Sequence, residues 1–177
     1  MLVLAATSVF STTLEKLALD DMILKSTEIV RGRVTSISAL RRGALILTQV
    51  RVTVTERWKG PEAASVDVFL HGGTFQGLRQ TFSGTPDLRE GSEYVFFLWA
   101  GKSGNRQIIG LSQGVLDIQV PASEPGKPSG GAQLLAHRAA IADMIDTKTE
   151  QPVADPGFTI KLDQLRKRVN QVLKAER

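Results

Sequence analysis

The sequence predicts a mainly β protein that folds as an antiparallel β-barrel, with a short helix near the amino terminus and an amphipathic helix at the carboxyl terminus. Residues 28–70 divide into three segments in which apolar and polar side chains alternate, as they do in strands with one face toward water. The first segment changes phase once, and small barrels need such bends to curl their long strands. Both ends of the chain carry apolar residues at helical spacing instead.

The middle segment of the three alternates most regularly. Its apolar face is formed by Val50, Val52 and Val54. Its other face is polar and carries Gln49, Arg51, Thr53, Thr55 and Arg57. In the first segment the apolar positions slip from Val34 to Ile37, so we expect a β-bulge or a sharp bend near Thr35 to Ser36. The third segment repeats the alternation with Val66, Val68 and Leu70.

The 177 residues are enough for one domain with tails. We expect a signal-peptide remnant or a first strand over 1–12, the barrel over 13–120, a flexible loop over 121–131 and a carboxyl-terminal extension over 132–177. The apolar stripe of the final helix consists of Leu162, Leu165, Val169, Val172 and Leu173. Residues 132–145 fit a helix and a strand equally well, and both alternatives stay open.

Composition limits the classes of protein that fit. With 42% hydrophobic and 23% charged residues, the chain has the composition of a globular domain. No apolar run approaches the roughly 20 residues that a membrane helix needs, so we expect no transmembrane segment. The absence of cysteine excludes a disulfide scaffold and a thiolate metal site. The net charge of +4 permits an acidic partner without requiring one.

One motif resembles a catalytic nucleophile. Residues 110–114 read GLSQG, which matches the G-x-S-x-G elbow that presents a serine between a strand and a helix. Asp117 and His137 follow Ser112 in the order of a hydrolase triad. However, residues 115–120 alternate like another strand, and the repeating β and α units of a hydrolase sheet are missing. We therefore interpret the motif as a tight turn and predict that the protein is not an enzyme.

Metal and cofactor sites find no support in the sequence. The two histidines, His71 and His137, are far apart, and no HExxH spacing is present. The glycines that follow His71 lack the lysine of a phosphate-binding loop. We therefore predict no metal, no cofactor and no catalytic residues.

The first candidate for a binding surface is the glycine-rich segment from Gly72 to Glu90. A long irregular segment inside a compact domain is uncommon unless it has a function. The sequence fits either a long loop or short strands with glycine bulges. We predict that this segment contacts a protein, a peptide or a component of the cell envelope. The candidate residues are His71, Thr74, Phe75, Gln76, Arg79 and Phe82.

An alternative is a nucleic-acid-binding face. Four arginines fall on the predicted outer face of two neighbouring strands, namely Arg31, Arg33, Arg51 and Arg57. Proteins that bind single-stranded nucleic acid combine such charge with aromatic side chains on which bases stack. This face carries threonine, serine and glutamine in place of aromatics, and a stripe of solvated arginines explains it equally well. A partner of the protein class is therefore the leading prediction.

Four motifs taken in order resemble those of a family of bacterial exported proteins: EIVRGRV, VTVTERWKGP, REGSEYVFFL and IIGLSQGVLDI. The same order is similar, more distantly, to netrin-like modules and to the amino-terminal domain of the tissue inhibitors of metalloproteinases, which are OB-type barrels. The resemblance implies an OB-like barrel over about 17–120 and export to the periplasm or the cell exterior, with a cytoplasmic location left open. It marks as fold-defining Val30, Gly32, Val34, Lys59, Gly60, Gly91, Tyr94 and Phe97. Those inhibitors bind zinc through an amino-terminal cysteine, which this chain lacks, so the resemblance does not imply inhibition by that route.

Overall fold

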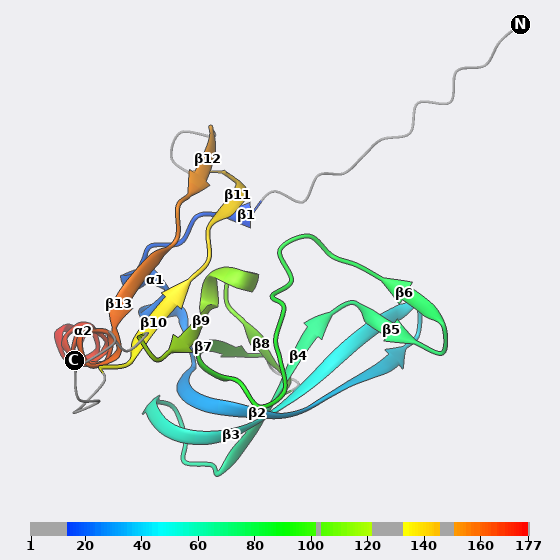
Figure 1. Ribbon diagram of the computed structural model, residues 1–177, viewed down its shortest axis with the longest axis horizontal. Coiled ribbons are helices and arrows are strands. Elements are labelled where there is room, and N and C mark those ends of the chain that lie inside the picture. Colours follow the sequence, from blue (N-terminus) through cyan, green and yellow to red (C-terminus); the bar gives the residue numbers. More distant parts are fainter. Residues whose placement is uncertain (1–13, 102–103, 122–132, 146–150, 177) are drawn as a thin grey trace, which may run out of the picture.

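The computed structural model describes residues 14–101, 104–121, 133–145 and 151–176, and this part of the chain is mainly β with two α-helices (Figure 1). The helices are α1 (Leu19–Lys25) and α2 (Leu162–Ala175), in the two places that the sequence predicts. The strands before the long irregular segment are β1 (Leu14–Glu15), β2 (Glu28–Arg42), β3 (Leu45–Lys59) and β4 (Ser65–His71). Those after it are β5 (Gly73–Phe75), β6 (Leu78–Gln80), β7 (Glu93–Ala100), β8 (Arg106–Ile108), β9 (Val115–Gln119), β10 (Leu135–Arg138), β11 (Ile141–Ile145), β12 (Pro152–Asp155) and β13 (Phe158–Lys161). The signal remnant or strand predicted over 1–12 and all but the first residue of the loop predicted over 121–131 lie outside the described residues.

One eight-stranded sheet has the strand order β13-β10-β9-β7-β2-β3-β4-β8. Strand β8 also pairs with β7, so the contacts among β2, β3, β4, β8 and β7 form a circuit that returns to its first strand. The contact between β4 and β8 is parallel and joins Val68 to Arg106, whereas the other pairings of the circuit are antiparallel. Strands β1, β11 and β12 form a second sheet, and β5 pairs with β6.

The predicted alternation in β3 and β4 is confirmed. Val50 and Val52 are fully buried, and Val54 packs against the same core. Arg51 and Thr53, which lie between these valines, are exposed. The buried positions of β4 are Val66, Val68 and Leu70.

Three register shifts interrupt the ladder between β2 and β3. The first leaves Thr35 without an opposite residue, which confirms the β-bulge expected there. The other two lie on β3, where Thr55 and Trp58 are the extra residues. Each bulge changes which side chains face inward beyond it, and this matters for Arg57, as described below.

Strand β7 is buried on both faces, as its continuous apolar run predicts. One face contributes Tyr94, Phe96 and Leu98 to a first core, which receives residues from all five strands of the circuit. The other face contributes Val95 and Phe97 to a second core beneath α1 and α2. In Figure 1 both helices lie away from β5 and β6, at the opposite side of the molecule.

The carboxyl-terminal extension continues the main sheet. Strand β10 pairs with β9, and β13 pairs with β10. The segment that the sequence leaves open between helix and strand is extended, because β10 and β11 occupy most of it. The apolar stripe predicted for α2 is confirmed by its buried residues Leu162, Leu165 and Val169. Within the described residues, no helix has both the length and the apolar composition needed to cross a bilayer.

Several motif residues serve the packing of the strands. A Cβ on Gly32 would lie 2.5 Å from the carbonyl oxygen of Thr53, so only glycine fits this close contact between β2 and β3. The ammonium group of Lys59 donates hydrogen bonds of 3.0 Å to two carbonyls in the last turn of α1, where a cation is favourable. Gly60 follows with φ of +98° and packs against Glu28.

The buried side chain of Gln113 joins η1 (Leu111–Gly114) to the beginning of the described chain. Its amide oxygen accepts a hydrogen bond of 2.8 Å from the Leu17 amide, and its amide nitrogen donates one of 2.8 Å to the Glu15 carbonyl. The GLSQG sequence therefore contains a residue that ties two distant segments together.

Candidate functional site

The segment after β4 begins with two short strands and continues over 81–92 without helix or strand, so both alternatives left open by the sequence apply to part of it. Strands β5 and β6 pair as a hairpin whose two-residue turn, Gln76 and Gly77, has positive φ at both positions. This is the backbone that a type I′ hairpin requires. The chain then returns past Phe82 and Pro86 to Leu88, which belongs to the first core.

Hydrogen bonds hold this segment against the main sheet. The Gly72 amide donates to the Ile46 carbonyl at 2.8 Å, and the hydroxyl of Thr48 donates to the Gly72 carbonyl at 2.7 Å. The Ile46 amide in turn donates to the side-chain oxygen of Gln80 at 2.8 Å. Farther along, the hydroxyl of Thr85 donates to the His71 carbonyl at 3.2 Å. The segment is therefore fixed by the strands beneath it.

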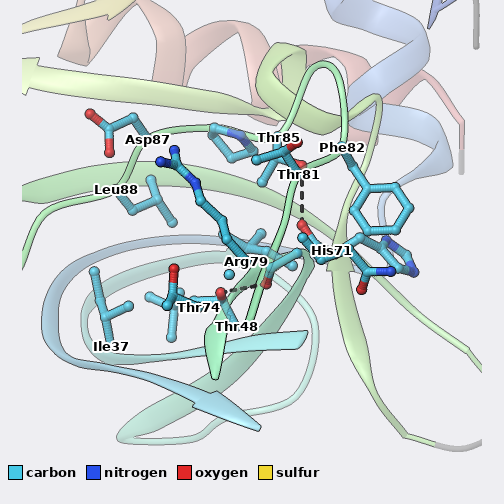
Figure 2. A pocket seen from close by; sticks show the side chains of 16 residues that line it. Ile37, Thr48, His71, Thr74, Arg79, Thr81, Phe82, Thr85, Asp87 and Leu88 are labelled. Atoms are coloured by element: carbon cyan, nitrogen blue, oxygen red, sulfur yellow. Dashed lines mark hydrogen bonds between the residues drawn. The ribbon is translucent and has the colours of Figure 1, made fainter. Parts of the chain in front are cut away.

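Between the hairpin and the returning chain lies a pocket of about 490 Å³, which we call the 71–88 pocket (Figure 2). Its apolar floor is the end of the first core, because Ile37, Val50, Leu70 and Leu88 line it. One wall carries the rings of His71 and Phe82, whose centroids lie 5.6 Å apart at an angle of 55°. The remaining lining residues are Thr48, Gly72, Gly73, Thr74, Arg79, Gln80, Thr81, Thr85, Pro86 and Asp87.

Four of the six residues predicted for the binding surface line this pocket. They are His71, Thr74, Arg79 and Phe82. Phe75 and Gln76 lie at the hairpin turn and do not line it. Sequence reasoning missed the floor residues, although the slip to Ile37 in the first strand already placed that side chain on the inner face. Nothing in the sequence indicated that Leu88 returns to the same core.

Arg79 is the cation of the pocket. It lies on β6 and is exposed, and its side chain forms no ion pair or hydrogen bond with any residue that the structure describes. Figure 2 shows its side chain directed toward the part of the pocket that carries Asp87 and Leu88. The Asp87 carboxylate forms an ion pair with Arg89 at 3.7 Å, and the side chain of Asp87 is 86% exposed.

The arginines of the alternative face are already partnered. Arg31 forms ion pairs with Glu56 and Glu93. Burial acts to lower its pKa, but the hydrogen bonds and charges of both carboxylates outweigh burial and raise it. Arg33 donates to the Gly91 carbonyl. The charge of Arg31 is therefore balanced within the protein, whereas Arg33 is held by a neutral carbonyl.

Arg51 forms a two-point ion pair with Asp67, with nitrogen–oxygen distances of 2.9 and 3.0 Å. The hydrogen bond from Arg51 has the largest effect on the pKa of Asp67, and together with the charge of Arg51 it outweighs burial and holds this pKa below its usual range. The Arg51 side chain remains 55% exposed, so it is the most accessible member of this ion pair.

Arg57 corrects the expectation that all four arginines share the exposed face. Its side chain is only 5% exposed and pairs with Glu28 at 2.8 Å. Glu28 also accepts a hydrogen bond of 2.6 Å from Arg106, so the three residues form a buried ion triad. The reason is the bulge at Thr55, which reverses the alternation and places Arg57 opposite the inward-facing Val30.

The structure brings Ser112, Asp117 and His137 to the lining of one cavity of about 320 Å³. They do not form a relay, because no side-chain hydrogen bond joins any two of them, although Asp117 and His137 are backbone partners in the β9–β10 pairing. The Nδ1 atom of His137 instead pairs with the hydroxyl of Thr159 at 3.0 Å. Ser112 lies in η1, which leads into strand β9, and the helix that a nucleophile elbow requires does not follow.

A larger hollow of about 700 Å³ lies beside Trp58 and Leu173, at the opposite end of β3. Its cationic groups already serve the fold, because Arg57 belongs to the ion triad and Lys59 binds the last turn of α1. The 71–88 pocket is the better candidate, since it combines an apolar floor with an arginine that has no described partner.

Among the residues that the structure describes, no group of three histidine, cysteine, aspartate or glutamate side chains lies together in a way that could hold a metal ion. What the 71–88 pocket can do chemically is hold an apolar group on its floor and an anion at its rim. In comparisons with family models, with curated proteins and with solved structures, no match to this chain was found.

Proposed function

We propose that this chain is a non-enzymatic binding module whose 71–88 pocket holds part of a protein, a peptide or a cell-envelope component. The pocket volume of about 490 Å³ lies in the range of about 300–1,000 Å³ that is typical of ligand sites. The observation that carries the proposal is an apolar floor that stays open while hydrogen bonds fix the walls around it. Such a preformed site does not have to be ordered when the ligand binds.

The proposal includes the kind of fold that presents this pocket. We infer that the strand circuit is an OB-like barrel related to netrin-like modules. Its support is the order of contacts, β2-β3-β4-β8-β7 and back to β2, in which Val68 and Arg106 join β4 to β8. A nuclear Overhauser effect between the backbones of Val68 and Arg106 is expected, and its absence would contradict closure.

The binding function can be tested with defined peptides. Pools of tetrapeptides that differ in their apolar residues are added to isotope-labelled protein, and backbone amide signals are followed by NMR. We expect shifts concentrated at Thr74, Arg79 and Phe82. Phe82→Ala should weaken binding at least tenfold, because it removes one wall of the pocket.

Trp99→Ala provides the matched control. Trp99 is also an exposed aromatic residue, at 48% against 39% for Phe82, and it lies outside the pocket on β7. Equal effects of the two substitutions, or shifts spread over the whole surface, would contradict a specific site. A single-stranded oligonucleotide serves as a second probe. If the protein binds it, and if Arg33→Ala abolishes this binding while Phe82→Ala does not, the nucleic-acid alternative is favoured.

Export is proposed as well, and it is supported by the family resemblance of the four motifs. Fractionation of cells that make the native chain should place it in the periplasm or the medium. Recovery in the cytoplasmic fraction alone would contradict this part of the proposal without affecting the pocket.

A further inference from the structure

The class of ligand can be inferred from Arg79, because the contacts of this arginine in the pocket differ from those of the other described arginines. Of the arginines that the structure describes, most contact a carboxylate, Arg33 and Arg41 donate to carbonyls, and Arg42 lies over the ring of Phe69. Arg79 is the exception within the described residues, because it has none of these contacts. A guanidinium group that is not used by the fold is available to a ligand.

The surroundings of Arg79 narrow the choice of ligand. Beneath it lies an apolar floor that includes Leu70 and Leu88, both nearly buried. The aromatic rings of His71 and Phe82 line another part of the same pocket. Asp87 is the carboxylate that lines the pocket, and it is highly exposed at the rim. A ligand that satisfies both features carries an apolar group and an anionic group close together.

We propose that the 71–88 pocket binds the carboxyl terminus of a peptide chain that ends in an apolar residue. The last side chain would lie on the floor, and the terminal carboxylate would accept two hydrogen bonds from the guanidinium of Arg79. A chain terminus fits better than an internal aspartate or glutamate, because it presents both groups on one residue. This inference rests on the proposed binding function of the same pocket.

The test compares peptides that differ only in their terminal charge. Tetrapeptides ending in leucine or phenylalanine are made as free acids and as amides, and dissociation constants are measured by NMR titration or calorimetry. For the unchanged protein we expect the free acid to bind at least tenfold more tightly than the amide. In Arg79→Ala the two forms should bind equally, whereas Phe82→Ala should weaken both forms by the same factor.

Arg41→Ala is the matched control for charge. It removes an exposed arginine that lies outside the lining of the pocket and donates to the Gly43 carbonyl, so it should keep the preference for the free acid. Arg79→Lys should keep only part of the preference, because an ammonium group cannot make the two-point contact. A preference for the acid that persists in Arg79→Ala would overturn the inference.

The remaining outcomes separate this inference from the proposed function. If acid and amide bind the unchanged protein equally, and Phe82→Ala weakens both, the pocket binds peptides but the inference about the terminus is wrong. If neither form causes shifts at the pocket, the proposed function fails together with the inference. Competition by acetyl-leucine at the same concentration as the tetrapeptide would identify a small carboxylic acid, and not a peptide chain, as the ligand.

Discussion

The two ends of the β2–β3 pair differ in whether their charged side chains are buried and paired. At the end that includes Glu28, the ion triad is buried, and its carboxylate accepts hydrogen bonds from both Arg57 and Arg106. At the end that includes Ile37 and Thr48, the cation of the pocket is exposed and has no partner in the described part of the chain. The first arrangement stabilises the fold, and the second leaves groups free for a ligand. Substitutions at the two ends should therefore affect different properties of the protein.

The largest effect is expected from Glu28→Ala. The substitution leaves Arg57 buried without its anion, and breaking a buried ion pair in this way costs about 3–5 kcal/mol. The free energy of unfolding, measured by urea denaturation, should fall by this amount. Asp67→Ala is the control, because it breaks an ion pair whose arginine is largely exposed, and it should cost a small fraction of that loss. Equal losses would show that the triad is not the structural element inferred here.

A somewhat smaller loss is expected from Gln113→Ala. The substitution removes the hydrogen bond to the buried Leu17 amide, which costs about 1–3 kcal/mol, and the bond to the Glu15 carbonyl, which costs less because Glu15 is exposed. Amide exchange at Leu17 should accelerate more than exchange in β3. Gln119→Ala is the control, since Gln119 is exposed and its side chain bonds only to the side chain of Asp117 among the described residues. Unchanged exchange at Leu17 would argue that other contacts hold this segment.

At both ends, the inward-facing residues could be predicted wherever apolar and polar side chains alternate without interruption along a strand. Val50 and Val52 indicated the inner face of β3 because the extra residue of the nearby bulge, Thr35, lies on β2 and leaves the alternation along β3 unbroken. The same rule failed at Arg57, only five residues beyond Val52, because the bulge at Thr55 carries no signal in its side chains. An arginine in a strand is also interpreted as solvated unless a buried partner is known. The partner of Arg57 is Glu28, which lies on another strand, so the sequence around Arg57 did not indicate it.

The pocket was predictable only in part, for a related reason. Glycine density marked 72–90 as irregular, which drew attention to His71, Arg79 and Phe82. The floor of the pocket, however, belongs to strands far away in the sequence, and their relation to the segment depends on which strands pair. Sequence spacing cannot reveal such contacts, and it also cannot reveal which arginine lacks a partner.

A moderate effect, which depends on pH, is expected at Glu56. Burial acts to raise the pKa of this carboxyl group, but hydrogen bonds from Trp58 and Arg31, with the charges of Arg31 and Arg166, lower it below its usual range. Because the pKa is lower in the folded state, Glu56 contributes stability above its unfolded pKa of about 4.3, and this contribution disappears as the pH falls through the folded value.

The comparison with Glu56→Gln isolates that contribution. The unchanged protein should lose its advantage over Glu56→Gln when unfolding is measured from about pH 6 down to about pH 3. The advantage should be fully present at the upper end of this range. A difference in stability between the two proteins that does not vary with pH would show that the ionisation of Glu56 makes no contribution.

The smallest effect on stability is expected from substitution of Arg79 in the pocket. It can be compared directly with substitution of Arg57, because an arginine is then removed at each end of the β2–β3 pair. Arg79→Ala should change the free energy of unfolding by no more than about 0.5 kcal/mol, since the side chain is exposed and no described residue depends on it. Arg57→Ala should destabilise the protein markedly, because it removes a buried partner of Glu28. If Arg79→Ala were as damaging as Arg57→Ala, its guanidinium would be needed by the fold and would not be free for a ligand. If Arg79→Ala leaves stability unchanged but abolishes the preference for free-acid peptides, the guanidinium is used for binding alone, which is the difference between the two ends that we infer.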